Sequence, residues 1–525
     1  MNTLNQKKLG TLKSLGEKVN WNIEKERQEL LHQLYPLIKD WTEQLPNLRD
    51  IFRREEIDWL LTESLKSACF DTYRTELIPL IQFVAQTGYK DEPEVDINGK
   101  PSSSRTTPLH HTFEDYLILG NYPKLIDYLF QIYDRFDVNY TDESGLTHFH
   151  VACFFGCDEF VEKFLELGQD PNILEPKTSD TPLHLTLEHR HKKATELLLK
   201  YGANPNLANV WDVTPLHNVC KGGHDNADLA EILFEMSDEK QQLIQVNAQN
   251  ELGWTPLHYA LFYGSRKGIV QVLLRRGADS NLANVEGSTP LHIICNNFHS
   301  NIDLAELFFE INDERQQLVE VNARDNSGNA PLHLALKRRL KNLTELLLRR
   351  GADTNLANEK GSTPLHMICE RKYYVPFDMV ELFFKINDER KQTVEVNARD
   401  CCGRTALQLA VANLNSHAVD LLLNHGADLS LFVFRSESYL DQLLRQKLRC
   451  EDHLKLLLAC LAIIENLEKK GYELDRSVAL TIMKMFAKYE LFDKWEYNEI
   501  CWDYDLEFMS KAKEMMIKPN LTLQT

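Results

Sequence analysis

The amino-acid sequence predicts an all-α fold, an α-solenoid in which pairs of short helices with β-hairpin loops between the pairs stack in a row. Two observations lead to this prediction. The motif TPLH, or a close variant, recurs nine times at intervals of 33 to 42 residues, and a Gly-Ala step closes a leucine-rich segment after four of these copies. A repeated period of this length is typical of a repeat array. The copies begin at Thr107, Thr147, Thr181, Thr214, Thr255, Thr289, Ala330, Thr363 and Thr405.

One unit, residues 255–279, explains why each copy should form two helices. Thr255 can cap a helix that Pro256 starts, because proline fixes φ near the helical value at the first position. Arg275 and Arg276 fall at a predicted helix end, where positive charge is favoured, and Gly277 supplies the left-handed stop. Apolar residues mark one face of each helix: Leu257, Ala260 and Leu261 in the first, and Ile269, Val270, Val272, Leu273 and Leu274 in the second.

The combination of a capped TPLH helix, a second leucine-rich helix and a glycine stop resembles the ankyrin repeat, a β-turn followed by two antiparallel helices. From Thr214 onward, units of ordinary length alternate with units that carry about eight extra residues, so the chain repeats in modules of 74 or 75 residues. The extra segments read SDEKQQLIQVNAQN, INDERQQLVEVNARD and INDERKQTVEVNARD. Such similar copies indicate duplication of repeat pairs.

Three domains follow from this organisation. Residues 1–105 are expected to form a helical N-terminal cap with a degenerate repeat near its end, and residues 106–432 the nine repeats. Residues 433–525 are expected to form a C-terminal helical region, with apolar helices predicted over 440–467 and 478–491 that cap the last repeat or alternatively dock a partner helix. A repeat array needs a specialised cap at each end, because a bare end would expose a core face.

Composition narrows the function classes. The formal net charge is -19, and a sequence-independent grip on nucleic acid needs clustered Lys and Arg, so no nucleic-acid partner is expected. The N-terminus lacks an apolar signal region, and the longest apolar run, residues 456–464, is too short to span a bilayer. We therefore expect a soluble protein without a membrane partner, in the cytoplasm or alternatively in the nucleus.

The eleven cysteines are not expected to form disulfides or a metal site. Cys153, Cys220, Cys295 and Cys369 each lie six residues after a motif start, where a small buried residue belongs. Each also follows a motif histidine by three residues, but such a pair gives only two ligands and zinc requires three or four. The adjacent Cys401 and Cys402 fall at a predicted hairpin tip and form the candidate for an exposed, oxidisable pair.

No catalytic or cofactor-binding motif appears in the sequence. A phosphate-binding glycine loop, a nucleophile elbow, a zinc-protease helix and the kinase signatures are all missing. We therefore predict a protein that is not an enzyme and that has no catalytic, cofactor-binding or metal-binding residues.

The variable positions of the repeats predict a protein-binding surface. In ankyrin-like units the hairpin tip, the residue before the motif and the positions seven and eight after its start point away from the stack. Aromatic and arginine residues dominate interface hot spots, although the tryptophans could pack on neighbouring hairpins and the basic residues could form a solvated face. The candidate partner-binding residues are Phe154, Phe155, Trp211, Trp254, Phe262, Tyr263, Lys337, Arg338 and Arg371.

A second resemblance concerns the end of the chain. The segment FDKWEYNEICWDYDLEFMSKAKEMMIKPNLTL from Phe492, together with INDERQQLVEVNARD and GADTNLANEKGSTPLH in the array, is similar to ankyrin proteins of parasitoid wasps that end in a poxvirus-type PRANC domain. That resemblance implies an F-box-like element that docks a Skp-type adaptor of a cullin ubiquitin ligase. No Leu-Pro-opened F-box-like run follows before Thr525, so this part is expected to be missing. Two functions remain: a non-catalytic scaffold for a partner protein, and alternatively a substrate receptor of a cullin-type ubiquitin ligase.

Overall fold

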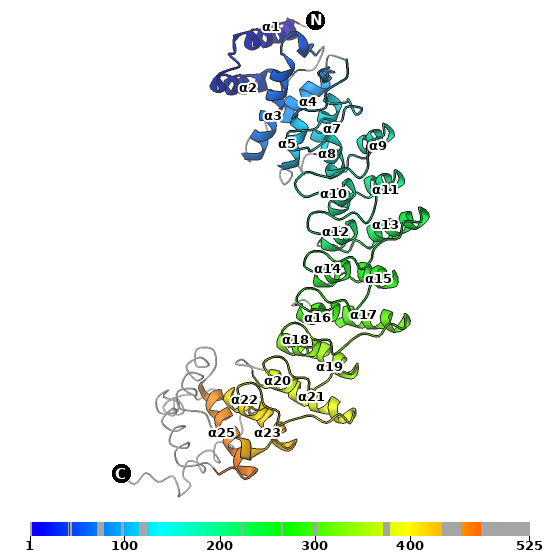
Figure 1. Ribbon diagram of the computed structural model, residues 1–525. Helices are drawn as coiled ribbons and strands as arrows, with labels where there is room; N and C mark the ends of the chain where they lie inside the picture. Colours follow the sequence, from blue (N-terminus) through cyan, green and yellow to red (C-terminus); the bar gives the residue numbers. More distant parts are fainter. Residues whose placement is uncertain are drawn as a thin grey trace, which may run out of the picture. The chain divides into compact units, whose positions relative to one another are not determined.

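The computed structural model describes residues 3–39, 41, 45–70, 78–95, 99–114, 123–222, 224–263, 266–297, 302–370, 378–432 and 453–473. The chain divides into two compact units, Met1–Asp279 and Ser280–Thr525. Each unit is built from helices (Figure 1), and the described residues contain only isolated β-bridges and no strand longer than one bridge. The all-α prediction is confirmed.

Unit 1 begins with helices that precede the first motif. They are α1 (Thr3–Lys18), α2 (Glu24–Ile38), the short 3-10 helix η1 (Leu48–Asp50), α3 (Arg54–Phe70) and α4 (Ile78–Gln86). Helix α3 packs on α5 and α4 packs on α7 of the first repeat. The pair α3 and α4 therefore adjoins the array as a further helix pair, while the degenerate repeat and the domain bounds stay predictions.

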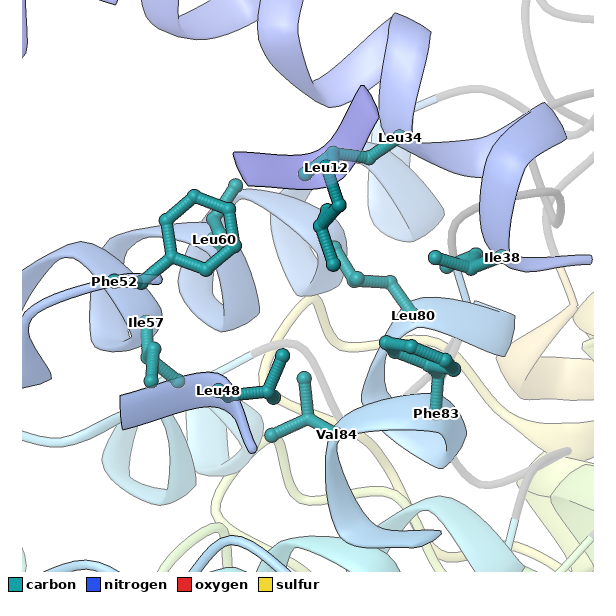
Figure 2. Close-up of a pocket in the computed structure, with 10 residues that line it drawn as sticks. All are labelled: Leu12, Leu34, Ile38, Leu48, Phe52, Ile57, Leu60, Leu80, Phe83 and Val84. Atoms are coloured by element: carbon teal, nitrogen blue, oxygen red, sulfur yellow. The ribbon is translucent and has the colours of Figure 1, made fainter. Parts of the chain in front are cut away.

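The core of these N-terminal helices is apolar and nearly filled. Ten side chains line a cavity of about 10 Å³ in this core, and Figure 2 shows how they lie. A cavity of that size needs polar partners to hold a water molecule, and none of its lining side chains is polar, so it belongs to the packing core. The lining residues are Leu12, Leu34, Ile38, Leu48, Phe52, Ile57, Leu60, Leu80, Phe83 and Val84.

The motifs of unit 1 each give the expected helix pair. The pairs are α5 (Pro108–Glu114) with α7 (Pro123–Ile132), α8 (His148–Phe155) with α9 (Asp158–Glu166), α10 (Pro182–Glu188) with α11 (Lys192–Lys200), α12 (Pro215–Lys221) with α13 (Ala227–Glu239), and α14 (Pro256–Phe262) with α15 (Lys267–Arg275). First helices pack on first helices, from α5 through α8, α10 and α12 to α14, and second helices form a parallel row beside them (Figure 1).

Unit 2 repeats the pattern. Its pairs are α16 (Pro290–Asn296) with α17 (Ile302–Glu314), α18 (Pro331–Arg338) with α19 (Lys341–Arg349), α20 (Pro364–Cys369) with α21 (Asp378–Glu389), and α22 (Ala406–Ala412) with α23 (Ser416–Asn424). After the 3-10 helix η3 (Leu429–Leu431), helix α25 (His453–Lys469) packs on α23. It overlaps the predicted helix over 440–467, whereas the one predicted over 478–491 lies outside the described residues.

The extra residues of the long units lengthen the second helix. Helices α13, α17 and α21 have 13, 13 and 12 residues, against 9 in α11, α15, α19 and α23. The ordinary units end in glycines with positive φ, as at Gly202 (φ 98°). Two residues after the last residue of each long helix, the corresponding positions are Gln241, Gln316 and Lys391, with φ near 57°. Both are left-handed stops of the kind that ends helices.

Candidate protein-interaction surface

The hairpin tips are held in place by the histidines of the motifs. In the fourth repeat, Nδ1 of His217 accepts a hydrogen bond from the Thr214 backbone N–H at 3.0 Å, and Nε2 lies 3.0 Å from the Trp254 carbonyl oxygen of the next hairpin. Because a carbonyl only accepts, Nε2 carries the proton. Burial lowers the pKa of His217 to about 4. The ring is thus a neutral bridge between consecutive repeats.

The same hydrogen bonds occupy the histidine of a His-x-x-Cys pair. Both ring nitrogens of His217 are engaged in hydrogen bonds, and Cys220 is fully buried, which raises the pKa of its thiol well above the ordinary value. Neither group is therefore prepared to bind a cation. Among the residues that the structure describes, no group of three or more His, Cys, Asp or Glu side chains could hold a metal ion.

A ladder of asparagines joins the loops on the other side of the repeats. The Asn247 amide donates to the Gly277 carbonyl oxygen at 3.3 Å, and its oxygen accepts from the Asp279 backbone N–H at 2.8 Å. The motif alone does not predict this ladder, although the members of the ladder recur at the alternating intervals of the motifs. They are Asn172, Asn206, Asn247, Asn281, Asn322, Asn355 and Asn397.

An aromatic patch, defined as Trp254, Tyr259, Phe262 and Tyr263, runs along helix α14. The Trp254 ring lies 5.1 Å from Tyr259 and 5.4 Å from Phe262, and Phe262 lies 5.3 Å from Tyr263 (centroid distances). The Trp254–Phe262 and Phe262–Tyr263 contacts are edge-on, and such contacts stabilise aromatic rings beyond their area burial. Phe262 is 51% exposed and Tyr263 43%, while Trp254 is half-buried.

Two contacts hold this patch from below. The Asn250 amide donates to the Tyr259 hydroxyl at 2.9 Å, and the guanidinium of Arg266 lies 4.5 Å from the centre of the Tyr263 ring. Arg266 is itself buried and donates to the Cys220 carbonyl oxygen at the end of α12, where positive charge is favourable. The rings of Tyr259 and Tyr263 are therefore held in position by Asn250 and the buried Arg266.

The neighbouring hairpin tip adds exposed apolar side chains. Trp211 is 45% exposed, and its carbonyl oxygen accepts a hydrogen bond from the Glu251 backbone N–H at 3.2 Å, which joins the tips of consecutive repeats. Val210 and Leu252 on the same two tips are also exposed. Unit 1 thus presents apolar tips beside the aromatic patch.

The other predicted residues of unit 1 occupy a different environment. Phe154 is buried, because its ring packs 4.6 Å from Phe113 and 4.1 Å from His189 (centroid distances). Phe155 is half-buried beside it, with ring centroids 5.1 Å apart. The structure therefore does not bring Phe154 to the surface, and its neighbours cover the ring.

The basic residues belong to unit 2. Lys337 is exposed at the end of α18. Arg338 is half-buried, and its Nε and Nη2 donate to the Asn296 side-chain oxygen at 3.1 and 2.9 Å. Arg371 lies outside the described residues. None of the described helices has the length and apolar content needed to cross a bilayer.

Comparison with known proteins identifies the repeats. The family model for ankyrin repeats in three copies matches residues 115–209, 183–284, 261–358 and 339–432, which together cover more than half of the chain. The chain belongs to the ankyrin-repeat family. The wasp-type resemblance of the sequence gains no support from these matches, and its C-terminal segment lies outside the described residues.

Several ankyrin-repeat relatives share part of the array. The B-cell lymphoma 3 protein homolog of Mus musculus is 29% identical over 236 residues, which cover 44% of this chain and 50% of the relative. The phosphocholine transferase AnkX of Legionella pneumophila is 27% identical over 239 residues, 43% of this chain and 24% of the relative. The crystal structure of the ankyrin repeat domain of Bcl-3 has a TM-score of 0.38 and 29% identity, and covers 43% of this chain and 95% of that structure. The chain therefore spans half or less of the length of these curated relatives.

Proposed function

We propose that this chain is a non-catalytic scaffold that binds a partner protein on its hairpin tips and first helices. The observation that carries the proposal is the aromatic patch on α14, whose rings contact one another while two of them, Phe262 and Tyr263, remain about half exposed. Soluble proteins rarely leave contiguous apolar surface uncovered without a binding role. The ankyrin-repeat family of the chain supports the same conclusion.

The patch has the properties of an interface hot spot. Tryptophan and tyrosine dominate such sites, because they bury a large area and lose few rotatable bonds on binding. The contacts from Asn250 and Arg266 restrict Tyr259 and Tyr263 before any partner arrives, which reduces the entropy lost on binding. The apolar tips at Val210, Trp211 and Leu252 would enlarge the contact area.

The rest of the proposed surface plays different parts. Phe154 would act by supporting Phe155, since its own ring is covered. Lys337, Arg338 and Arg371 would contribute positive charge to a separate contact in unit 2. Such charges mainly steer encounter and specificity, so the aromatic patch should account for most of the binding energy.

Proximity labelling in the native cell type tests the proposal. The double variant Trp254→Ala/Phe262→Ala is expected to lose the partners of the parent, because each truncated hot-spot residue typically costs about 2 kcal/mol, or roughly thirtyfold in Kd. The matched control is Leu243→Ala, an even more exposed apolar residue in the same unit that lies outside the patch. The proposal fails if the double variant, checked for folding by circular dichroism, retains every partner.

The resemblance of residues 492–525 to PRANC proteins supports a second candidate, a substrate receptor of a cullin-type ubiquitin ligase. This function would use the same surface to choose a substrate, and residues 492–525 would have to contact a Skp-type adaptor without the F-box-like run that the family uses for docking. Co-purification with a cullin complex separates the two candidates. Recovery of cullin by the parent, and its loss on removal of residues 492–525, would favour the ligase role.

A further inference from the structure

Two adjacent thiols stand at the hairpin tip that precedes α22. Cys401 and Cys402 are both exposed, and their Sγ atoms lie 3.9 Å apart. The backbone around them is fixed at several points: the Cys401 N–H donates to the Lys360 carbonyl oxygen at 2.9 Å, and the Cys402 N–H donates to the Asp400 carboxylate at 2.9 Å. The tip therefore presents two sulfur atoms together to solvent.

The other described cysteines differ from this pair in accessibility. Cys153, Cys220, Cys295 and Cys369 are buried under the helices, and Cys157 is half-buried. Burial raises the pKa of all five thiols, to about 12 for Cys369. Since the thiolate is the reactive form, these five are protected from thiol chemistry by both access and ionisation, whereas the tip pair lacks the first protection.

We propose that Cys401 and Cys402 form a reversible dithiol–disulfide site that reacts with low-molecular-weight disulfides. The thiolate of one cysteine attacks the external disulfide, which gives a mixed disulfide and releases one small thiol. The second cysteine then loses its proton and attacks the protein sulfur of that mixed disulfide, which closes the Cys401–Cys402 bond and expels the second small thiol. The pair loses two electrons and two protons, and the external disulfide is reduced to two thiols.

The closed form is expected to be easily reduced. Consecutive Cα atoms lie about 3.8 Å apart, which is shorter than the roughly 4.4 Å at which relaxed disulfides begin. Strained and exposed disulfides have high reduction potentials and are the labile ones. Closure of the disulfide would also strain the hydrogen bond from the Cys401 N–H to the preceding hairpin tip. Oxidation is therefore expected to disturb the hairpin of the neighbouring repeat.

The chain itself supplies a matched control for the two thiols. In the preceding module, Asn326 and Ser327 occupy the same two tip positions, and the Asn326 N–H makes the equivalent hydrogen bond to the Glu286 carbonyl oxygen at 2.9 Å. Replacing the pair by Cys401→Asn and Cys402→Ser is therefore expected to preserve the hairpin. Each single replacement leaves one thiol in an unchanged backbone.

The experiment treats the folded full-length chain with oxidised glutathione and examines the peptide containing residues 401 and 402 by mass spectrometry. The parent peptide is expected to lose two hydrogen atoms and to carry no glutathione. Each single variant should instead retain a glutathione adduct on its remaining cysteine, and a mild dithiol should return all three to the starting mass. The peptide containing buried Cys295 should stay unmodified.

Two results would overturn the proposal. A stable glutathione adduct on the parent tip, in the same yield as in the single variants, would mean that the second thiol does not close the ring. Absence of any product on the parent, or on the single variants, would mean that the thiols are not available to disulfides.

Discussion

At the scale of single residues, the repeats depend on neutral histidines. His150 and His217 are both buried, and desolvation lowers the pKa of each to about 4. The unfolded chain holds these groups at their ordinary pKa, near 6.5, so below that pH the unfolded state binds more protons than the folded state. The contribution of these neutral histidines to the free energy of unfolding is therefore fully present above about pH 6.5. It is lost as the pH falls toward 4.

This difference predicts acid sensitivity. The urea concentration at the midpoint of unfolding should decrease as the pH is lowered from about 6.5 to 4. Each titrating histidine should lower the free energy of unfolding by up to about 1.4 kcal/mol per pH unit. The chain again offers a control, because in the ninth motif the Gln408 side-chain oxygen accepts from the Thr405 N–H at 3.0 Å in place of histidine. His217→Gln should keep this cap and flatten the pH dependence. An equally steep profile in His217→Gln would contradict the assignment.

At the scale of helices, the ends are set by backbone conformation. Gly202 ends the second helix of its repeat with φ of 98°, and a Cβ added there would meet no atom within 4 Å. Glycine is therefore required at this position because of the left-handed backbone conformation, which residues with a Cβ atom rarely adopt. It is not required for lack of space around the side chain. Gly10 lies inside α1 without positive φ, and a Cβ there would also meet nothing.

The two glycines predict opposite effects of the same substitution. Gly202→Ala should destabilise the protein by about 1 kcal/mol, because alanine is strained at that φ. Gly10→Ala should stabilise it by about 0.5 to 1 kcal/mol, because alanine is the better residue within a helix. Urea unfolding of both variants measures the difference. Equal shifts in the two would show that helix stops do not limit stability here.

The sequence predicted the elements well and the surface less fully, for a physical reason. Helix starts and stops are local, so the threonine caps and glycine ends could be read from the motif. Exposure depends on neighbours that meet only on stacking. Phe154 and Phe262 occupy the same motif position, yet Phe113 and His189 cover the first while the second stays half exposed. The family assignment is confirmed, whereas the partner role of these residues stays a prediction.

At the scale of the whole molecule, each repeat is stabilised by its immediate neighbours, so the first repeat needs its own anchor. Arg105 pairs with Asp58 on α3 and with Asp91, at 2.9 Å for the latter. The hydroxyls of Tyr133 and Tyr140 donate to the same two carboxylates at 2.5 Å. Burial raises the pKa of Asp58 and Arg105 opposes the rise. This network fastens the N-terminal helices to the array.

Removing the charge of Arg105 should destabilise only the N-terminal end of the array. Arg105→Met leaves two largely buried carboxylates without their counter-charge, which is expected to cost about 3 kcal/mol. Hydrogen exchange should quicken in α3, α5 and α7 and stay unchanged in α18 and α19, because coupling in a repeat array passes between neighbours. Arg135→Met, which breaks an exposed pair with Asp137, should cost less than about 1 kcal/mol. Uniformly faster exchange along the whole chain would contradict this local coupling.

The alternation of long and ordinary second helices has a consequence for how such a chain changes in length. Gly351 and Gly426 are separated by 75 residues, and each is followed by Ala-Asp. An in-frame deletion of residues 352–426 would therefore join Gly351 to Ala427 and recreate the same three-letter junction, with α19 in the sequence position of α23. Unequal recombination can thus add or remove such two-repeat modules without creating a new junction sequence. The number of modules can therefore change rapidly in evolution.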